Sequence, residues 1–230
     1  MALGLAWAGG ALTGWAEEAN APVMYTAERP LVVGIVIFEG FEQLDVFGPV
    51  EMLSMLRDRS KVVLLAERAG PVKGSKGVVV MADRSIDDPG PLDVVLVPGG
   101  MGTRREVNNE AMLVRLRELD QTTPYVGSVC TGSAVLAKAG ILDGIRATTN
   151  KRAYAWATSQ GPKVVWVPRA RWVEDGKYIT SSGVSAGMDM TLGLIAKRFD
   201  VATARECAQG AEYVWAEDAT IDPFAAVNGL

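Results

Sequence analysis

The sequence LVVGIVIF at residues 31–38 is almost entirely apolar, and most of its residues are β-branched. A β-strand buried on both faces has this composition, because neither of its faces meets water. The segment that follows, residues 45–57, spaces its apolar side chains along one helical stripe: Val46, Val50, Leu53 and Leu56. A buried strand that leads into an amphipathic helix is typical of a sheet covered by helices on both faces.

The same alternation continues through the rest of the chain. Further strands are predicted at residues 61–67, 93–97, 125–129, 146–149, 164–167, 171–173 and 178–180, and a hairpin at 72–82. Helices are predicted from the capping residues Asn108 and Asn109 to residue 119, and at residues 133–139, 151–159, 186–199 and 201–215. This order predicts an α/β fold, a flavodoxin-like three-layer sandwich with a mostly parallel sheet and helices on both faces.

The chain of 230 residues fits one large α/β domain, which we place at residues 31–230, after an N-terminal segment and linker at residues 1–30. Residues 1–16 carry no charge and resemble the apolar part of an export signal, cleaved between Ala16 and Glu17. The basic start of such a signal is missing, so one hypothesis places it upstream of Met1. The alternative is an apolar arm packed on the protein itself or on a partner subunit. Export would place the protein in the periplasm; otherwise we expect the cytoplasm.

The composition excludes several classes of site. The chain has no histidine, so it can build neither a Ser-His-Asp nor a Cys-His-Asn triad, and no His-based zinc, haem or iron site. Its formal net charge is −4, and no basic block is present, which argues against binding nucleic acid. The spacing of the two cysteines, Cys130 and Cys207, does not indicate a disulfide.

Cys130 stands where a predicted strand passes directly into a helix, in the sequence SVCTG at residues 128–132. A nucleophile on such a sharp turn needs small residues two positions before and after it, and Ser128 and Gly132 supply them. The helix N-terminus is expected to favour the thiolate and to lower the thiol pKa. The alternative is a cysteine buried in the core. Cys207 lies on an apolar helical stripe and is expected to pack in the core.

Two further strand ends are candidates for the same site. After the strand at 93–97, Gly99 and Gly100 could leave backbone N–H groups free to stabilise a developing negative charge, although an ordinary turn is the simpler interpretation. Asp45 follows the first strand and is either a helix cap or a carboxylate that reaches Cys130. In the second case the like charge should raise its pKa. Glu51 is expected to be a structural or surface charge, and Asp189, on a later helix, a surface or capping charge.

Together these motifs resemble the ThiJ/PfpI superfamily, whose fold is that of class I glutamine amidotransferase domains, over about residues 31–215. The resemblance is carried by QLDVFGP (43–49), VPGG (97–100), SVCTGS (128–133), ATTN (147–150) and DGKYITSSGVSAGMDM (175–190). Within the superfamily, Cys-Thr-Gly-Ser after the strand and Asp-x-x-Gly-Pro after the first strand are similar to the isonitrile hydratase branch.

By this resemblance Cys130 is the nucleophile, Asp45 the acid and base, and Thr131 a hydrogen-bonding partner, while Gly99 and Gly100 adjoin the substrate. The implied reaction adds water to a small isonitrile through a cysteine thioimidate and gives an N-substituted formamide. It implies a homodimer that needs no metal and no organic cofactor. We expect a small-molecule substrate, no nucleic acid, and no membrane once a signal is removed.

Two departures from the family pattern are visible. Asn150 lines the predicted site where many relatives carry histidine, and Thr131 stands where proteases and amidases carry histidine. These absences argue against protease, amidase, deglycase and glyoxalase activity. Regulators with this domain need a helix-turn-helix module, which is not expected in the residues after Trp215. The alternative function is a redox-sensitive cysteine in a stress-response or binding protein.

Overall fold

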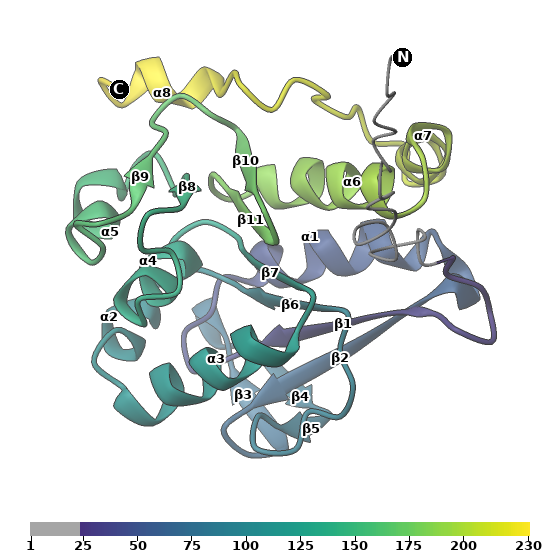
Figure 1. The fold of residues 1–230 in the computed structure, drawn as a ribbon, viewed down its shortest axis with the longest axis horizontal. Helices are drawn as coiled ribbons and strands as arrows, with labels where there is room; N and C mark the ends of the chain where they lie inside the picture. Colours follow the sequence, from purple (N-terminus) through teal and green to yellow (C-terminus); the bar gives the residue numbers. More distant parts are fainter. Residues whose placement is uncertain (1–23) are drawn as a thin grey trace, which may run out of the picture.

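The computed structural model describes residues 24–230, and its centre is a seven-stranded sheet in the order β10-β11-β7-β6-β1-β2-β5 (Figure 1). The strands, in this order, are Trp172–Asp175, Tyr178–Ser181, Tyr125–Ser128, Val94–Val97, Leu31–Val36, Ser60–Ala66 and Arg84–Ser85. All neighbours are parallel except β10 and β11, which form an antiparallel hairpin. The predicted mostly parallel sheet is confirmed.

The central strands are buried on both faces, as their composition predicts. Every residue of β6 is buried, and β1 is buried except for Val32, which is partly exposed. In the parallel register Val33 pairs with Val94 and Ile35 with Leu96, so the two strands end at the same edge of the sheet. The predicted ligand site lies beyond this edge.

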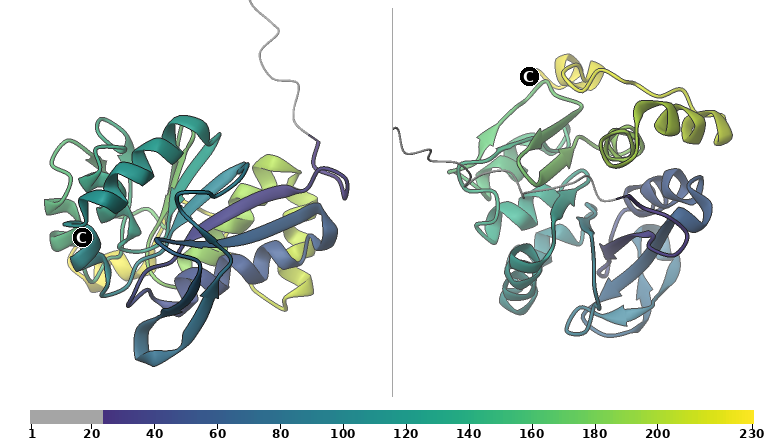
Figure 2. Two further views of the ribbon diagram at one scale, coloured as in Figure 1. Left: turned by 90° about the horizontal axis from the view of Figure 1, so that it is seen from below. Right: turned by 45° about the vertical axis from the view of Figure 1, so that its right-hand side comes forward.

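Helices cover the two faces of the sheet in two groups, which Figure 2 shows on opposite sides. One group is α1 (Gln43–Ser54), α6 (Ala186–Arg198) and α7 (Val201–Gly210), which contact one another. The other is α2 (Thr103–Glu106), α3 (Glu110–Thr122) and α4 (Gly132–Lys138), with α5 (Tyr154–Ser159) against α4. The expected cap Asn109 accepts a hydrogen bond from the Met112 N–H at the start of α3.

Smaller elements complete the fold. The predicted hairpin is β3 (Gly70–Lys73) with β4 (Val79–Ala82), while β8 (Arg146–Ala147) and β9 (Val165–Trp166) pair in a separate small sheet. Two 3-10 turns lie at Arg57–Arg59 and Ser75–Gly77. Patterning did not reveal α2 or α8 (Pro223–Val227), because both are too short to show a helical period. The predicted helix at 201–215 ends at Gly210, and the chain then turns away.

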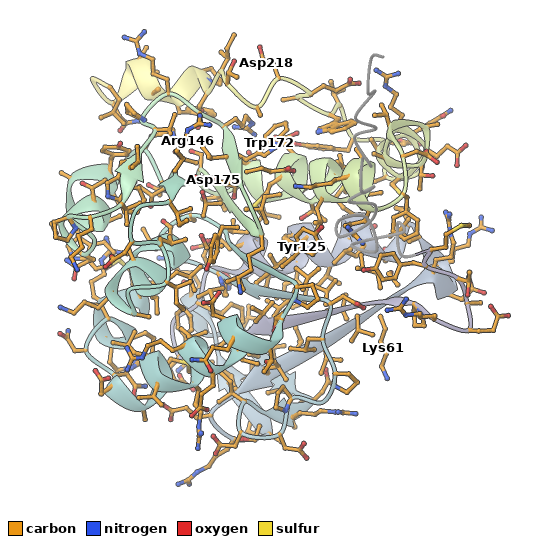
Figure 3. All side chains as sticks on the ribbon, in the orientation of Figure 1. Lys61, Tyr125, Arg146, Trp172, Asp175 and Asp218 are labelled. Atoms are coloured by element: carbon orange, nitrogen blue, oxygen red, sulfur yellow. The ribbon has the colours of Figure 1, made fainter. Side chains whose placement is uncertain are left out.

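Asp189 is not the surface or capping charge that we expected. It is fully buried on α6, where its carboxylate accepts hydrogen bonds from Arg171 Nε at 2.7 Å, Tyr213 Oη at 3.0 Å and the Ala216 N–H at 2.9 Å. It therefore ties the chain beyond α7 to the hairpin side of the sheet. Figure 3 marks Trp172, which lies on β10 beside α6 and is buried.

Cys207 is buried in α7, as expected, and Glu51 is exposed on α1. The export-like segment at residues 1–16 lies outside the described residues. Within residues 24–230, no helix has both the length and the apolar character needed to cross a bilayer.

Candidate active site

Cys130 lies on a sharp turn between β7, which ends at Ser128, and α4, which begins at Gly132. Its φ of 59° is in the left-handed region, which side chains other than glycine rarely adopt. The turn is held because the Cys130 N–H donates to the carbonyls of Ser181 and Ser182, both at 3.2 Å. A Cβ at position 132 would lie 2.0 Å from the Val97 carbonyl oxygen, so the expected small residue is sterically required there.

Asp45 is the third residue of α1 and is only 1% exposed. Its Oδ2 accepts a hydrogen bond of 2.9 Å from the Gly99 backbone N–H, whereas its buried Oδ1 has no hydrogen-bond partner of normal geometry within the described part of the chain. The residue that precedes the helix is Glu42, so Asp45 is not the helix cap. Its carboxylate instead lies against the loop after β6, close to the Cys130 thiol, with which it interacts.

The environment of Asp45 favours its neutral form. Burial raises its pKa to about 7, while the hydrogen bonds from Gly99 and from the Cys130 thiol partly oppose the shift. The expected direction is confirmed, but the leading cause is loss of solvation rather than a neighbouring negative charge. A carboxyl group with this pKa can both accept and release a proton near neutral pH.

Burial raises the pKa of the Cys130 thiol well above its ordinary value, and the neighbouring Asp45 carboxylate adds to the shift. The Thr131 N–H and the Asn150 amide oppose it by donating hydrogen bonds to the sulfur. The expected lowering of the pKa is therefore wrong for this resting site. The residue is only 5% exposed, so loss of water outweighs the short helix that follows. The site holds a neutral thiol beside a carboxyl group that can take its proton.

Asn150 makes direct contact with the sulfur. Its Nδ2 donates to Cys130 Sγ at 3.1 Å, and its Oδ1 accepts from the Ala153 N–H at 2.9 Å. Because a backbone N–H can only donate, the second bond fixes the amide with its NH₂ group toward the sulfur. An asparagine in this place supplies a hydrogen-bond donor and no base. The preceding Thr149 hydroxyl donates to the Cys130 carbonyl at 3.0 Å and anchors this loop.

Gly99 and Gly100 do not offer free N–H groups, which corrects the prediction for these residues. The Gly99 N–H is bonded to Asp45, and the Gly100 N–H donates to Thr131 Oγ1 at 3.1 Å. A Cβ on Gly99 would lie 2.6 Å from the Thr131 nitrogen and 2.8 Å from Asp45 Oδ2. The loop is glycine-rich because the carboxylate and the threonine pack directly on its backbone.

Thr131 is buried, and its backbone N–H and its side-chain hydroxyl have different partners. Its backbone N–H donates to the sulfur, while its hydroxyl contacts Gly100 and lies 3.2 Å from the Thr103 hydroxyl. The structure thus brings all six predicted site residues into one connected cluster: Cys130, Asp45, Thr131, Gly99, Gly100 and Asn150.

Sequence reasoning missed two residues at this site. Arg104 on α2 stacks its guanidinium 3.8 Å above the Trp156 ring, and its charge interacts with Cys130. Gly183 lies against the sulfur, since a Cβ there would be 2.0 Å from Asn150 Nδ2 and 3.0 Å from Cys130 Sγ. Arg104 belongs to a helix that the pattern did not reveal. Gly183 lies within the motif at 175–190, but glycine has no side-chain group from which a role at the site could be predicted.

A cavity of about 510 Å³ adjoins this cluster. Its lining includes Asn150, whose amide donates to the sulfur, and Gly183, together with Leu44, Phe224, Val227 and Asn228. A larger cavity of about 640 Å³, near Glu67 and Glu106, contains none of the residues that contact Cys130. No group of three or more Cys, Asp or Glu side chains within residues 24–230 is arranged to hold a metal ion.

The fold and this cysteine site define a member of the DJ-1/PfpI family, because the model of that family matches residues 32–197. The predicted resemblance is confirmed. Among individual relatives, isonitrile hydratase from Pseudomonas putida is 36% identical over 185 residues, which cover 80% of this chain and 78% of that protein. The HTH-type transcriptional regulator GbdR from Pseudomonas aeruginosa is 31% identical over 174 residues, covering 74% of this chain and 47% of the regulator.

Solved structures agree with the assignment of the fold. A ThiJ/PfpI family protein from Pseudomonas syringae superposes with a TM-score of 0.74 at 27% identity, covering 80% of this chain and 75% of that one. DJ-1beta from Drosophila melanogaster superposes with a TM-score of 0.71 at 22% identity, covering 81% of this chain and 100% of that one. These likenesses confirm the flavodoxin-like α/β class.

Proposed function

We propose that this protein is a cysteine-dependent isonitrile hydratase, which adds water to a small isonitrile and releases an N-substituted formamide. The observation that carries the proposal is the buried pair of Cys130 and Asp45, in which the carboxyl pKa is raised to about 7. Such a carboxyl group can serve as base and acid in turn at neutral pH. The similarity to the Pseudomonas putida isonitrile hydratase supports the same reaction.

In the first step the Cys130 sulfur attacks the terminal carbon of the isonitrile and a C–S bond forms. Asp45 takes the thiol proton during the attack, so the reaction does not need a thiolate formed beforehand, which the raised thiol pKa would disfavour. Asp45 then delivers this proton to the same carbon. The product is a covalent thioimidate, R–N=CH–S–Cys130, and no external oxidant or reductant is needed.

In the second step water adds to the thioimidate carbon. Asp45 accepts one proton from the water and passes it to the substrate nitrogen. The C–S bond then breaks, the remaining hydroxyl proton returns to sulfur, and R–NH–CHO leaves. The Asn150 amide and the Thr131 N–H donate to the sulfur while it carries negative charge in both steps. The scheme uses no metal and no organic cofactor.

The alternative function, a redox-sensing or binding protein, depends on an easily oxidised thiolate. The raised thiol pKa of Cys130 argues against ready oxidation, because the neutral thiol is a weak nucleophile toward oxidants. An attack assisted by Asp45 is not limited in this way. We therefore favour the hydratase. We also propose a homodimer, as the family resemblance implies, which sedimentation analysis can test.

The test is incubation of the purified protein with cyclohexyl isocyanide and detection of N-cyclohexylformamide by mass spectrometry. We expect product with the wild type, none with Cys130→Ala, and undiminished product with Cys207→Ala, because that cysteine is buried in α7 away from the site. A folded wild type with an intact Cys130 thiol that forms no formamide would overturn the proposal.

A further inference from the structure

The chain beyond α7 runs across the molecule to α8, and α8 lies on the side that carries α5 and β9 (Figure 1). It is fixed to the body at several points. The Arg171 N–H donates to the Ala219 carbonyl, and the Asp222 N–H donates to the Arg169 carbonyl, both at 2.8 Å. The Trp215 indole donates to the Asp189 carbonyl at 3.1 Å. These bonds hold the segment in one path across the surface.

Asp222 anchors the start of α8. The residue is 4% exposed, and its carboxylate lies 3.9 Å from Lys151 Nζ and 3.8 Å from Arg171 Nη1. Its Oδ1 also accepts from the Phe224 N–H at 3.0 Å, so the same side chain caps the helix. Since Lys151 directly follows Asn150, α8 is held next to the loop that contacts the sulfur.

This placement makes α8 one wall of the cavity that Asn150 and Gly183 also line. Phe224, Val227 and Asn228 come from the α8 end of the chain and face the same space as Leu44 of α1. The same space is lined by Asn150, whose amide donates to Cys130 Sγ, and by Gly183, which lies beside that amide. A ligand that occupies this cavity and reaches the sulfur beside Asn150 would place its remaining group against α8.

The residues that line this cavity favour an apolar substituent on the ligand. Leu44, Phe224 and Val227 are apolar and 39%, 52% and 79% exposed, so they offer surface that a ligand can cover. No residue lining this cavity in residues 24–230 is acidic. Of its two basic residues, Lys151 is buried and paired with Asp222, while Arg152 is exposed and adds positive charge. Covering apolar surface is favourable, and a cationic group would meet the like charge of Arg152 and no carboxylate in the cavity lining.

We propose that Phe224 and Val227 determine substrate specificity by binding the N-substituent, and that this substituent is a neutral alkyl or aryl group rather than a cationic one. The inference deepens the proposed hydratase function and rests on it for the identity of the substrate. Binding of the apolar group itself follows from the cavity and can be measured without turnover.

The kinetic test compares methyl and cyclohexyl isocyanide in wild type and Phe224→Ala. We expect the KM for cyclohexyl isocyanide to rise about tenfold, while kcat stays within about twofold and the KM for methyl isocyanide is unchanged. Phe224→Leu keeps an apolar wall and should stay within about twofold of wild type. The matched control is Ile221→Ala, an exposed apolar residue, 64% exposed, that does not line the cavity.

The second test separates this inference from the proposed function. In a Cys207→Ala background, N-cyclohexylformamide should protect Cys130 from iodoacetamide, with a Kd about tenfold weaker in Phe224→Ala. If the protein shows no turnover but its protection still depends on Phe224, the proposed hydratase activity is refuted and the proposed binding role of Phe224 stands. If the protein does turn over, but neither protection nor KM changes in Phe224→Ala and Val227→Ala, then these two residues do not bind the N-substituent, and the proposed hydratase activity stands. Melting curves show that each variant is folded.

Discussion

The Gly99 backbone N–H donates a hydrogen bond of 2.9 Å to Oδ2 of Asp45, and this bond determines which carboxyl oxygen is available for chemistry. Oδ1 is buried without a hydrogen-bond partner of normal geometry in residues 24–230. The interaction of Asp45 with the Cys130 thiol must therefore use a carboxyl group whose other oxygen is fixed by the main chain. Oδ1 is therefore the carboxyl oxygen that is left to exchange a proton with the thiol.

The rate of formamide formation should rise with pH through about 7. Asp45 has to be ionised to accept the thiol proton, and burial raises its pKa to about 7. Asp45→Asn should lower the rate by about 10²- to 10⁴-fold, the usual contribution of a general base. A series of initial rates from about pH 5 to pH 9 checks both points. A wild-type rate independent of pH across this range would contradict the role of Asp45.

Asp45→Asn should also stabilise the folded protein at alkaline pH. The folded-state pKa is raised from 3.8 to about 7, so between these values the folded protein keeps a proton that the unfolded chain has lost. The stability contributed by this proton is lost as the pH rises through about 7. The variant cannot ionise, so its gain over wild type should be on the order of 2–4 kcal/mol at about pH 8 and should vanish toward pH 4. Urea unfolding at both pH values measures the difference.

Asn150→Ala should raise the thiol pKa further by about one pH unit, because the variant loses the donor that lies 3.1 Å from the sulfur. The pH dependence of iodoacetamide alkylation, followed in a Cys207→Ala background, reports this value. Asn108→Ala serves as the control, since Asn108 is exposed and bonds only to the Arg104 carbonyl. Identical alkylation profiles for wild type and Asn150→Ala would show that the amide does not affect the thiol.

Gly183→Ala should reduce thiol reactivity by displacing Asn150, because the new Cβ would lie 2.0 Å from Nδ2. We expect a shift of the alkylation profile in the same direction as in Asn150→Ala. The double variant should then behave like Asn150→Ala alone, since the group to be displaced is already gone. Additive effects would mean that the substitution also acts on Cys130 directly, through the new Cβ, which would lie 3.0 Å from Sγ.

The export hypothesis predicts a mature N-terminus at Glu17 when the protein is isolated from its native host. Mass spectrometry of the intact protein measures this directly. An unprocessed chain that begins at Met1 would instead favour the apolar arm.

Buried strands and the residues at their ends were predictable because both have strong local signals. The composition of residues 31–38 requires burial on two faces, and the crowded turn at Cys130 requires small residues around it. Parallel strands then bring Cys130 and Asp45 to one edge of the sheet. The cluster of Cys130, Asp45 and Asn150 therefore follows largely from topology.

The ionisation of these groups and the partners of single atoms were not predictable in the same way. The thiol pKa depends on how completely the surrounding chain removes water from Cys130, which no local pattern records. The roles of Gly99 and Gly100 were misjudged because their N–H groups bind side chains that arrive from distant segments. Asp189 was misjudged for a similar reason, since its partner Arg171 lies on another element.

The salt bridge between Lys151 and Asp222 has a consequence for biosynthesis. Lys151 Nζ is held inside the protein by the Thr148 hydroxyl at 2.7 Å and the Ala170 carbonyl at 2.6 Å, but its counter-charge comes from Asp222, much later in the chain. A nascent polypeptide that ends between Lys151 and Asp222 could therefore bury this ammonium group only without its carboxylate. The pocket beside the sulfur is completed only after α8 has been synthesised.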